Sequence, residues 1–203
     1  MNNTVKRTAY KITAIAVTAI LTLCIFKSMP ANAAEVSNTV KFFSLAPKID
    51  GKVSEEEWGK SVFTVKEGEP NINIIKKDNV KLEDFTADIY LGYDSTHIYI
   101  AAVAEYENHV NETIKSGDIW NGDCLQTQIS ATAGTKRNEF NFACNSVTGK
   151  SMADASQCAG TFSMQGGEGK DYIITRDGNK TVYEIAIGIE QFSKDVKELT
   201  SGM

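Results

Sequence analysis

The chain has 203 residues, with 21 basic and 26 acidic side chains and a formal net charge of −5. This acidic balance argues against nucleic acid or an anionic membrane surface as the partner, because both attract basic proteins. It is compatible with neutral ligands and with calcium.

The first segment of the chain predicts export. Three basic residues precede the apolar run Ile12–Phe26, and small residues at Ala31 and Ala33 follow it. This pattern is typical of a secretory signal peptide, with cleavage after Ala33 or Ala34. The apolar run has 15 residues, which is short for a membrane span of ~20; an uncleaved anchor is the alternative. We expect a secreted protein, extracellular or at the cell surface, with no membrane contact after cleavage.

The part that follows the signal peptide is large enough for one domain with its own core. Removal of residues 1–33 takes away four basic and no acidic residues, which leaves 17 against 26 and a net charge of −9. We expect an N-terminal linker at 34–46 and the domain at 47–203. Its three cysteines fit no zinc pattern. Cys144 and Cys158 could form a disulfide, but we favour small buried apolar side chains for these two and for Cys124.

Short alternating runs between turn signals predict an all-β fold, an antiparallel β-sandwich of jelly-roll or immunoglobulin type. The clearest unit is a hairpin with strands at 86–93 and 97–105, joined by a turn at 94–96. Residues 101–104 are apolar without a break, as expected of a central strand covered on both faces. A second hairpin at 171–189 turns at Asp177–Asn179, and it places Tyr183, Ile185 and Ile187 on one face.

Two more alternating runs, 124–130 and 139–145, predict strands with one face toward the core. Their inward residues are Leu125, Thr127 and Ile129 in the first run and Phe140, Phe142 and Cys144 in the second. Their outward residues are Cys124, Gln126, Gln128 and Ser130, followed by Asn141, Ala143 and Asn145.

Helix is scarce in the predicted domain. Ser54 and Glu57 form a capping box for one short turn. We expect Trp58, directly after it, to be a core anchor rather than a ligand contact. Residues 191–199 predict a second short helix.

The sequence contains no familiar catalytic motif such as GxSxG, HExxH or a phosphate-binding loop. His97 follows a turn and His109 lies in a polar loop, and for both we favour an ordinary role over catalysis or metal binding. Glycoside hydrolysis needs two acids across a cleft. Glu105, Glu107 and Asp123 are candidates, but the sequence does not show which acids are paired.

Trp120 is the strongest candidate for a ligand contact. It lies in the polar, glycine-containing loop NETIKSGDIWNGD, where a tryptophan either packs on the core or offers a platform. An indole can cover the apolar face of a sugar ring, while polar side chains bond its hydroxyls. Four neighbouring polar residues are candidates for this second role or for supporting the loop: Asp123, Gln126, Asn141 and Asn145.

Five segments in order resemble family 9 carbohydrate-binding modules, from about Lys48 to Leu199. They are KIDGKVSEEEW, LGYDSTHIYIAAVAEYE, IWNGDCLQTQIS, FNFACNSVTG and YEIAIGIEQF. The resemblance implies a secreted, non-catalytic β-sandwich that is usually appended to xylanases and related glycoside hydrolases. It implies binding of xylan or glucan chains between two tryptophans, with bound calcium supporting the loops. Trp120 matches the first of those tryptophans.

The chain departs from the family pattern at three places. Gln126 stands where the family has an acid, and Ala143 stands where well-studied members have an arginine, so the sugar specificity stays open. In the family, the second tryptophan lies in further strands that have no counterpart before Met203, and we expect the domain to be incomplete at its C-terminus. Four alternatives remain open: the N-terminal part of an enzyme that hydrolyses O-glycosyl compounds, a haem-binding domain, a surface-interaction domain, and a sandwich whose binding site has decayed. The conceivable axial haem ligands are His97, His109, Met152 and Met164.

Overall fold

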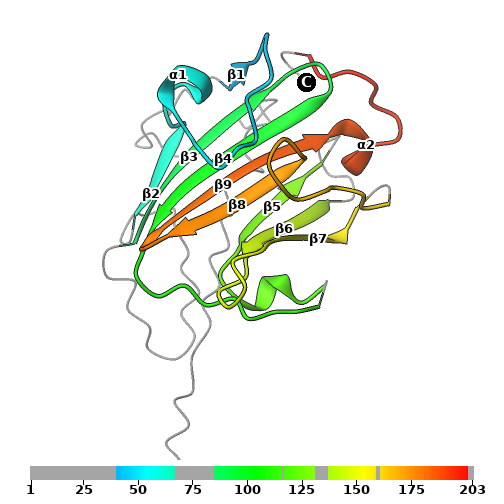
Figure 1. Ribbon diagram of the computed structural model, residues 1–203. Helices are drawn as coiled ribbons and strands as arrows, with labels where there is room; N and C mark the ends of the chain where they lie inside the picture. Colours follow the sequence, from blue (N-terminus) through cyan, green and yellow to red (C-terminus); the bar gives the residue numbers. More distant parts are fainter. Residues whose placement is uncertain (1–39, 67–84, 116, 131–136, 159–160, 201–203) are drawn as a thin grey trace, which may run out of the picture.

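Two β-sheets pack face to face in the computed structural model, which describes residues 40–66, 85–115, 117–130, 137–158 and 161–200 (Figure 1). The expected signal peptide at 1–33 lies outside these residues. Strands dominate the described part, which confirms the predicted all-β sandwich. No helix in these ranges is long and apolar enough to cross a membrane.

The larger sheet has the strand order β1-β3-β4-β9-β8, and β2 also pairs with β3. Every pairing in it is antiparallel except that of β1 with β3. Its strands are β1 (Lys41–Phe42), β2 (Phe63–Lys66), β3 (Thr86–Tyr93), β4 (His97–Glu105), β8 (Tyr172–Asp177) and β9 (Lys180–Gly188).

Both predicted hairpins are confirmed within this sheet. The pairing of β3 with β4 begins beside the turn, at Tyr93 and Ile98, and continues to Thr86 and Glu105, so the turn lies at the expected position. Asp94 closes that turn, since its Oδ1 accepts hydrogen bonds from the backbone N–H groups of Thr96 and His97, each at 2.7 Å. β8 and β9 are joined through Gly178, whose φ of +54° is a conformation that glycine adopts without a steric cost.

The smaller sheet contains the strands β5 (Leu125–Ile129), β6 (Asn138–Cys144) and β7 (Ser151–Gln157), in that order. The predicted inward faces are confirmed, because Ile129, Phe140, Phe142 and Cys144 are buried in the core between the sheets. β7 was not predicted from the sequence. Ser151 at its start bridges the sheets, since its Oγ contacts both the backbone N and O of Ile174 at 2.9 Å.

The main core fills the space between the two sheets. The fully buried side chains there come from strands of both sheets: Ile100, Ile129, Phe140, Phe142, Ile174, Ile185 and Ile187. Burying a large aliphatic or aromatic side chain stabilises the fold by about 1.5–3 kcal/mol. The alternating pattern that was visible in the sequence therefore supplies the main driving force for packing the sheets.

A second apolar cluster covers the other face of the larger sheet, as predicted for the apolar run in β4. It contains Phe43, Ile49, Trp58, Tyr99 and Ala101. Trp58 ends α1 (Glu55–Trp58), and Ser54 caps this helix by accepting from the backbone N–H of Glu57 at 3.4 Å. The predicted cap by Ser54 and the predicted core role of Trp58 are confirmed, since the Trp58 side chain is 2% exposed. The other half of the capping box differs, because Glu57 Oε1 accepts from the backbone N–H of Lys48 at 2.7 Å.

Two expected boundaries differ from the structure. β1 and the buried Phe43 lie within the segment expected as a linker, so the folded part begins before residue 47. The helix expected at 191–199 is instead α2 (Ile189–Phe192). It ends because Ser193 is extended and its Oγ accepts from the N–H groups of Asp195 and Val196.

No disulfide joins the three described cysteines, Cys124, Cys144 and Cys158. Cys124 and Cys144 are buried and Cys158 is partly buried. The structure therefore agrees with the favoured interpretation of small apolar side chains and contains no Cys144–Cys158 disulfide.

Candidate ligand-binding site

Trp120 lies on η2 (Ile119–Asn121), a single helical turn in the loop that precedes β5. Its side chain is 38% exposed, one of a few large apolar side chains at the surface of the described part. The indole Nε1–H donates to the backbone carbonyl of Gly117 at 2.9 Å. The polar edge of the ring is therefore satisfied by the protein itself.

The helical turn is fixed onto the face of the smaller sheet that points away from the larger one (Figure 1). Ile119 is 2% exposed and packs with Cys124, Ala143 and Met152 in a third apolar cluster. This contact explains why Ala143, predicted to face outward, is fully buried. Packing of Ile119 thus fixes the position of its neighbour Trp120.

A row of three polar side chains crosses the same face of the smaller sheet. Gln126 of β5 pairs in register with Asn141 of β6, and Asn141 pairs with Asp154 of β7. Gln126 Nε2 donates to Asn141 Oδ1 at 2.9 Å, and Asn141 Nδ2 donates to Asp154 Oδ1 at 2.8 Å. Asp154 Oδ2 accepts from the backbone N–H of Gly117 at 2.7 Å. Because Gly117 also accepts from Trp120, the row is connected to the indole.

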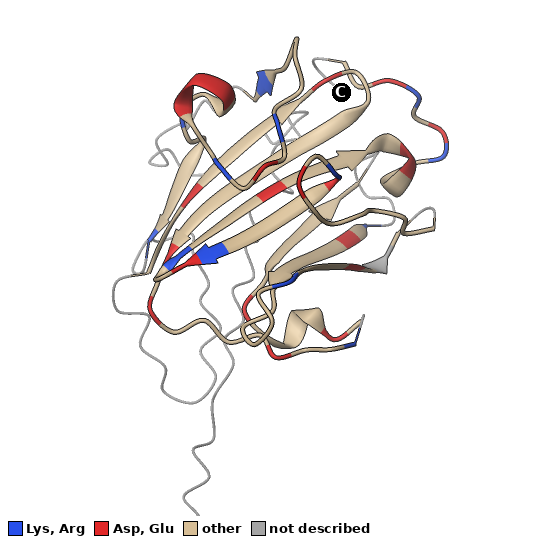
Figure 2. Cartoon of the chain, in the orientation of Figure 1, with Lys and Arg blue, Asp and Glu red and all other residues tan. Residues whose placement is uncertain are grey.

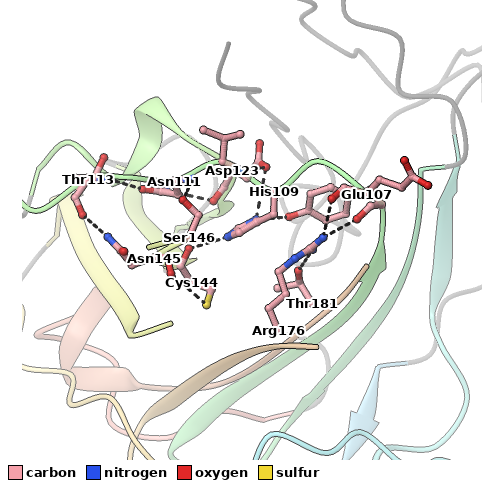
Figure 3. Close-up of polar contacts among 12 residues, drawn as sticks. Glu107, His109, Asn111, Thr113, Asp123, Cys144, Asn145, Ser146, Arg176 and Thr181 are labelled. Carbon is pink, nitrogen blue, oxygen red and sulfur yellow. Dashed lines mark hydrogen bonds and ion pairs between the residues drawn. The ribbon is translucent and has the colours of Figure 1, made fainter. Parts of the chain in front are cut away.

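Asp123 has its contacts on the interior side of the loop (Figure 3). Its side chain is 1% exposed, and Oδ2 accepts from the backbone N–H of Val110 at 2.7 Å. The same oxygen lies 3.5 Å from Nδ1 of His109. Oδ1 has no hydrogen-bond partner among the described residues.

His109 is held on both ring nitrogens. Nε2 is 2.8 Å from the carbonyl oxygen of Cys144, and Nδ1 is 2.8 Å from the hydroxyl of Tyr106. Since a carbonyl can only accept, Nε2 carries a proton. Burial alone lowers the pKa of His109, but its contacts with Asp123 and Cys144 outweigh burial and raise the pKa to about 9. A buried ion pair between His109 and Asp123 therefore stabilises the start of the loop at neutral pH.

Asparagines connect the same loop to the turn after β6. Asn111 Nδ2 donates to the carbonyls of Ile119 and Asp123 at 3.0 and 3.2 Å. Asn145 Nδ2 donates to the carbonyl of Thr113 at 2.9 Å, and its Oδ1 accepts from the N–H of Val147 at 3.0 Å. These buried bonds fix the loop backbone at both ends of η2.

The structure brings Trp120, Gln126, Asn141 and Asn145 to the outer side of the smaller sheet at different depths, whereas Asp123 points to the interior side of the loop. Trp120 is exposed enough to contact a ligand, and Gln126 is half-buried. Asp123, Asn141 and Asn145 are no more than 4% exposed, and their hydrogen bonds are made within the protein. Of the two roles expected for these three residues, their geometry fits support of the loop.

Asp154 and Asn111 belong to the site and were missed in the sequence. Asp154 lies in MADAS, whose alternation is weak because alanine and serine carry little hydrophobic contrast. Asn111 lies in a polar loop, where nothing in the local pattern separates a buried asparagine from a solvated one. Both are 2% exposed or less.

The other chemical candidates have structural partners. Among the described residues, no three His, Cys, Asp or Glu side chains come together as a metal site. His97 contacts the hydroxyl of Thr96 in the hairpin turn, and Met164 is buried in the main core. Asp123, 1% exposed, contacts His109 Nδ1 at 3.5 Å.

Charge does not single out another site. Figure 2 shows acidic residues spread over α1, both sheets and the loops, with basic residues near the β8–β9 turn. Arg176 of β8 is engaged there, donating to the carbonyls of Tyr106 and Glu107. A comparison of the chain with protein-family models, curated proteins and solved structures found no match.

Proposed function

We propose that the protein is a secreted, non-catalytic carbohydrate-binding module in which Trp120 is the sugar platform. The observation that supports this most directly is a partly exposed indole whose N–H is already bonded to Gly117. Such a ring has no polar group left to satisfy and offers an apolar surface. The C–H face of a pyranose matches that surface, with a gain of about 25 cal/mol per Å² removed from water.

The surroundings of Trp120 favour a preformed platform over a mobile side chain. Ile119 anchors the helical turn to the sheet, and Asn111 bonds the backbone at the first residue of the turn, Ile119, and just after the turn at Asp123. A platform that is fixed before binding loses little conformational entropy when the ligand arrives. Gln126 adds a half-buried polar group on the same face of the sheet for a ligand hydroxyl.

The proposed partners are xylan- or glucan-type polysaccharides and their oligosaccharides. Binding would hold an attached or associated glycoside hydrolase at its substrate, which raises the local concentration and supports carbohydrate catabolism without any chemistry in this domain. Both the predicted signal peptide and the acidic surface are consistent with a role outside the cell on neutral glycans.

Structural calcium stays part of the proposal without assigned ligands, since the described acidic side chains form no group of three or more. Calcium also binds backbone carbonyls, so a direct measurement is needed. Melting of the protein in calcium and in chelator tests it. An equal Tm in both would remove calcium from the proposal.

Calorimetric titration with xylo- and cello-oligosaccharides tests the binding function. The protein without its predicted signal peptide is compared with Trp120→Ala and with the control Ile114→Ala, which removes a 90% exposed apolar side chain from the same loop. We expect saturable heat for the parent and for Ile114→Ala and none for folded Trp120→Ala. Equal binding by all three, or no binding by the folded parent, would contradict the platform.

A further inference from the structure

The polar row across the smaller sheet has a fixed direction. Two bonds between side chains run from Gln126 to Asn141 and from Asn141 to Asp154, and one bond runs from the backbone N–H of Gly117 to Asp154, with each donor named first. All donors therefore point toward Asp154. Asn141 is fully buried and Asp154 is 2% exposed, so water does not compete for these groups.

This direction follows from the chemistry of one residue. An ionised carboxylate only accepts hydrogen bonds, whereas an amide group has one accepting and one donating end and can turn over. Asp154 therefore forces Asn141 to direct its Nδ2 toward β7. Asn141 then faces Gln126 with its acceptor Oδ1, so Gln126 must donate with its Nε2. The remaining atom of Gln126, its carbonyl Oε1, has no hydrogen-bond partner among the described residues.

We propose that Asp154 is a positioning residue that sets the hydrogen-bond direction of this row, so that Gln126 presents a carbonyl oxygen on the ligand side of the sheet. The site then selects a ligand group that donates a hydrogen bond, as a sugar hydroxyl does and an ether oxygen does not. The part of this inference that concerns the ligand rests on the proposed carbohydrate binding. The part that concerns the row does not.

Two variants change the presented atom while keeping the row matched. In Asp154→Asn, every side-chain amide of the row can reverse its orientation. The new amide accepts from the N–H of Gly117 with its oxygen and donates to Asn141 with its NH2 group. Asn141 then donates to the carbonyl oxygen of Gln126. Gln126 now presents its NH2 group instead of its carbonyl. In the double variant Asn141→Asp with Asp154→Asn, the carboxylate at 141 accepts from both neighbours, and Gln126 presents its carbonyl again.

Hydrogen exchange of the Gln126 side-chain amide, followed by NMR, tests the row without any ligand. We expect slow exchange in the parent, clearly faster exchange in Asp154→Asn, and slow exchange again in the double variant. Gln128 is the internal control, because its Nε2 donates to Glu139 at 2.9 Å outside the row. Its exchange should stay the same throughout. Unchanged exchange of Gln126 in Asp154→Asn, or failure of that variant to fold, would overturn the inference.

Oligosaccharide titration of the same three proteins tests the ligand part. We expect at least tenfold weaker binding by Asp154→Asn and recovery in the double variant. Equal binding by all three would overturn the contact at Gln126 and leave the platform function intact. Absence of binding by all three, together with the expected exchange pattern, would contradict the proposed function and leave the direction of the row established.

Discussion

Glu184 accepts a hydrogen bond from the indole N–H of Trp58 at 3.1 Å, across 126 residues of sequence. The other carboxylate oxygen accepts from the backbone N–H groups of Asp50, Gly51 and Lys52. The fully buried Glu184 thus fastens the segment KIDGKVSEEEW to the centre of the larger sheet. Two of the five segments that carry the family resemblance therefore meet at a structural contact and not at the candidate site.

Replacing this carboxylate tests its structural role. Glu184→Gln keeps the shape but turns one acceptor into a donor, which leaves either the indole or the backbone N–H groups unpaired. Because unpaired buried donors are costly, we expect a loss of about 2–4 kcal/mol in the free energy of unfolding. Glu56→Gln, an exposed change in α1, is the control and should have little effect. Equal stability of the two variants in denaturant titrations would disprove the role.

The raised pKa of His109 predicts a pH-dependent stability. The folded-state pKa is about 9 against an ordinary value of 6.5, so the protonated ring stabilises the fold. This contribution is fully present below about pH 6.5 and is lost as the pH rises through about 9. From 1.36 kcal/mol per pKa unit, we expect a loss on the order of 2–3 kcal/mol over this range.

Urea unfolding of the protein and of His109→Gln between pH 6 and 9.5 checks this prediction. Glutamine has no proton to lose in this window, so the variant should show a flatter stability profile than the parent. A profile equally steep in both proteins would assign the pH dependence to other groups.

The different burial of the three cysteines predicts the order in which their thiols react with a labelling reagent. Cys158 is partly buried, whereas Cys124 and Cys144 are buried. Because reaction requires access to the thiolate, we expect Cys158 to react first in the folded protein and all three thiols to react after unfolding. Cys158→Ser should remove the fast phase. Fewer than three reactive thiols in the unfolded, non-reduced protein would indicate a disulfide.

Gly122 provides a test of the loop that carries Trp120. A Cβ at this position would lie 2.7 Å from Cγ of Asn111 and 2.8 Å from the backbone oxygen of Val110. We expect Gly122→Ala to cost about 1–3 kcal/mol through overpacking, and to change the Trp120 fluorescence because η2 must shift. Asn121→Ala, exposed on the same turn, is the control. Unchanged stability and emission of Gly122→Ala would show that the loop is not tightly packed there.

The sequence by itself determined the position of those strands in which apolar and polar residues alternate strongly. The hairpin from Thr86 to Glu105 was predicted to the residue, and so was the inward face of Phe140, Phe142 and Cys144. Alternation and turn chemistry are local signals, and they are read from neighbouring residues. The capping of α1 by Ser54 is local in the same sense.

Only the tertiary structure decided what covers the outward residues. Asn141 was expected at the surface, but the strand period fixes a face and not its exposure; Asn141 is fully buried against Asp154 and Gln126. The helix expected at 191–199 ended at Phe192, because Leu199 is buried in the core and its backbone N–H donates to the carbonyl of Ser95 at 2.9 Å. Contacts between segments far apart in the chain made both decisions, and local periodicity carries no information about such contacts.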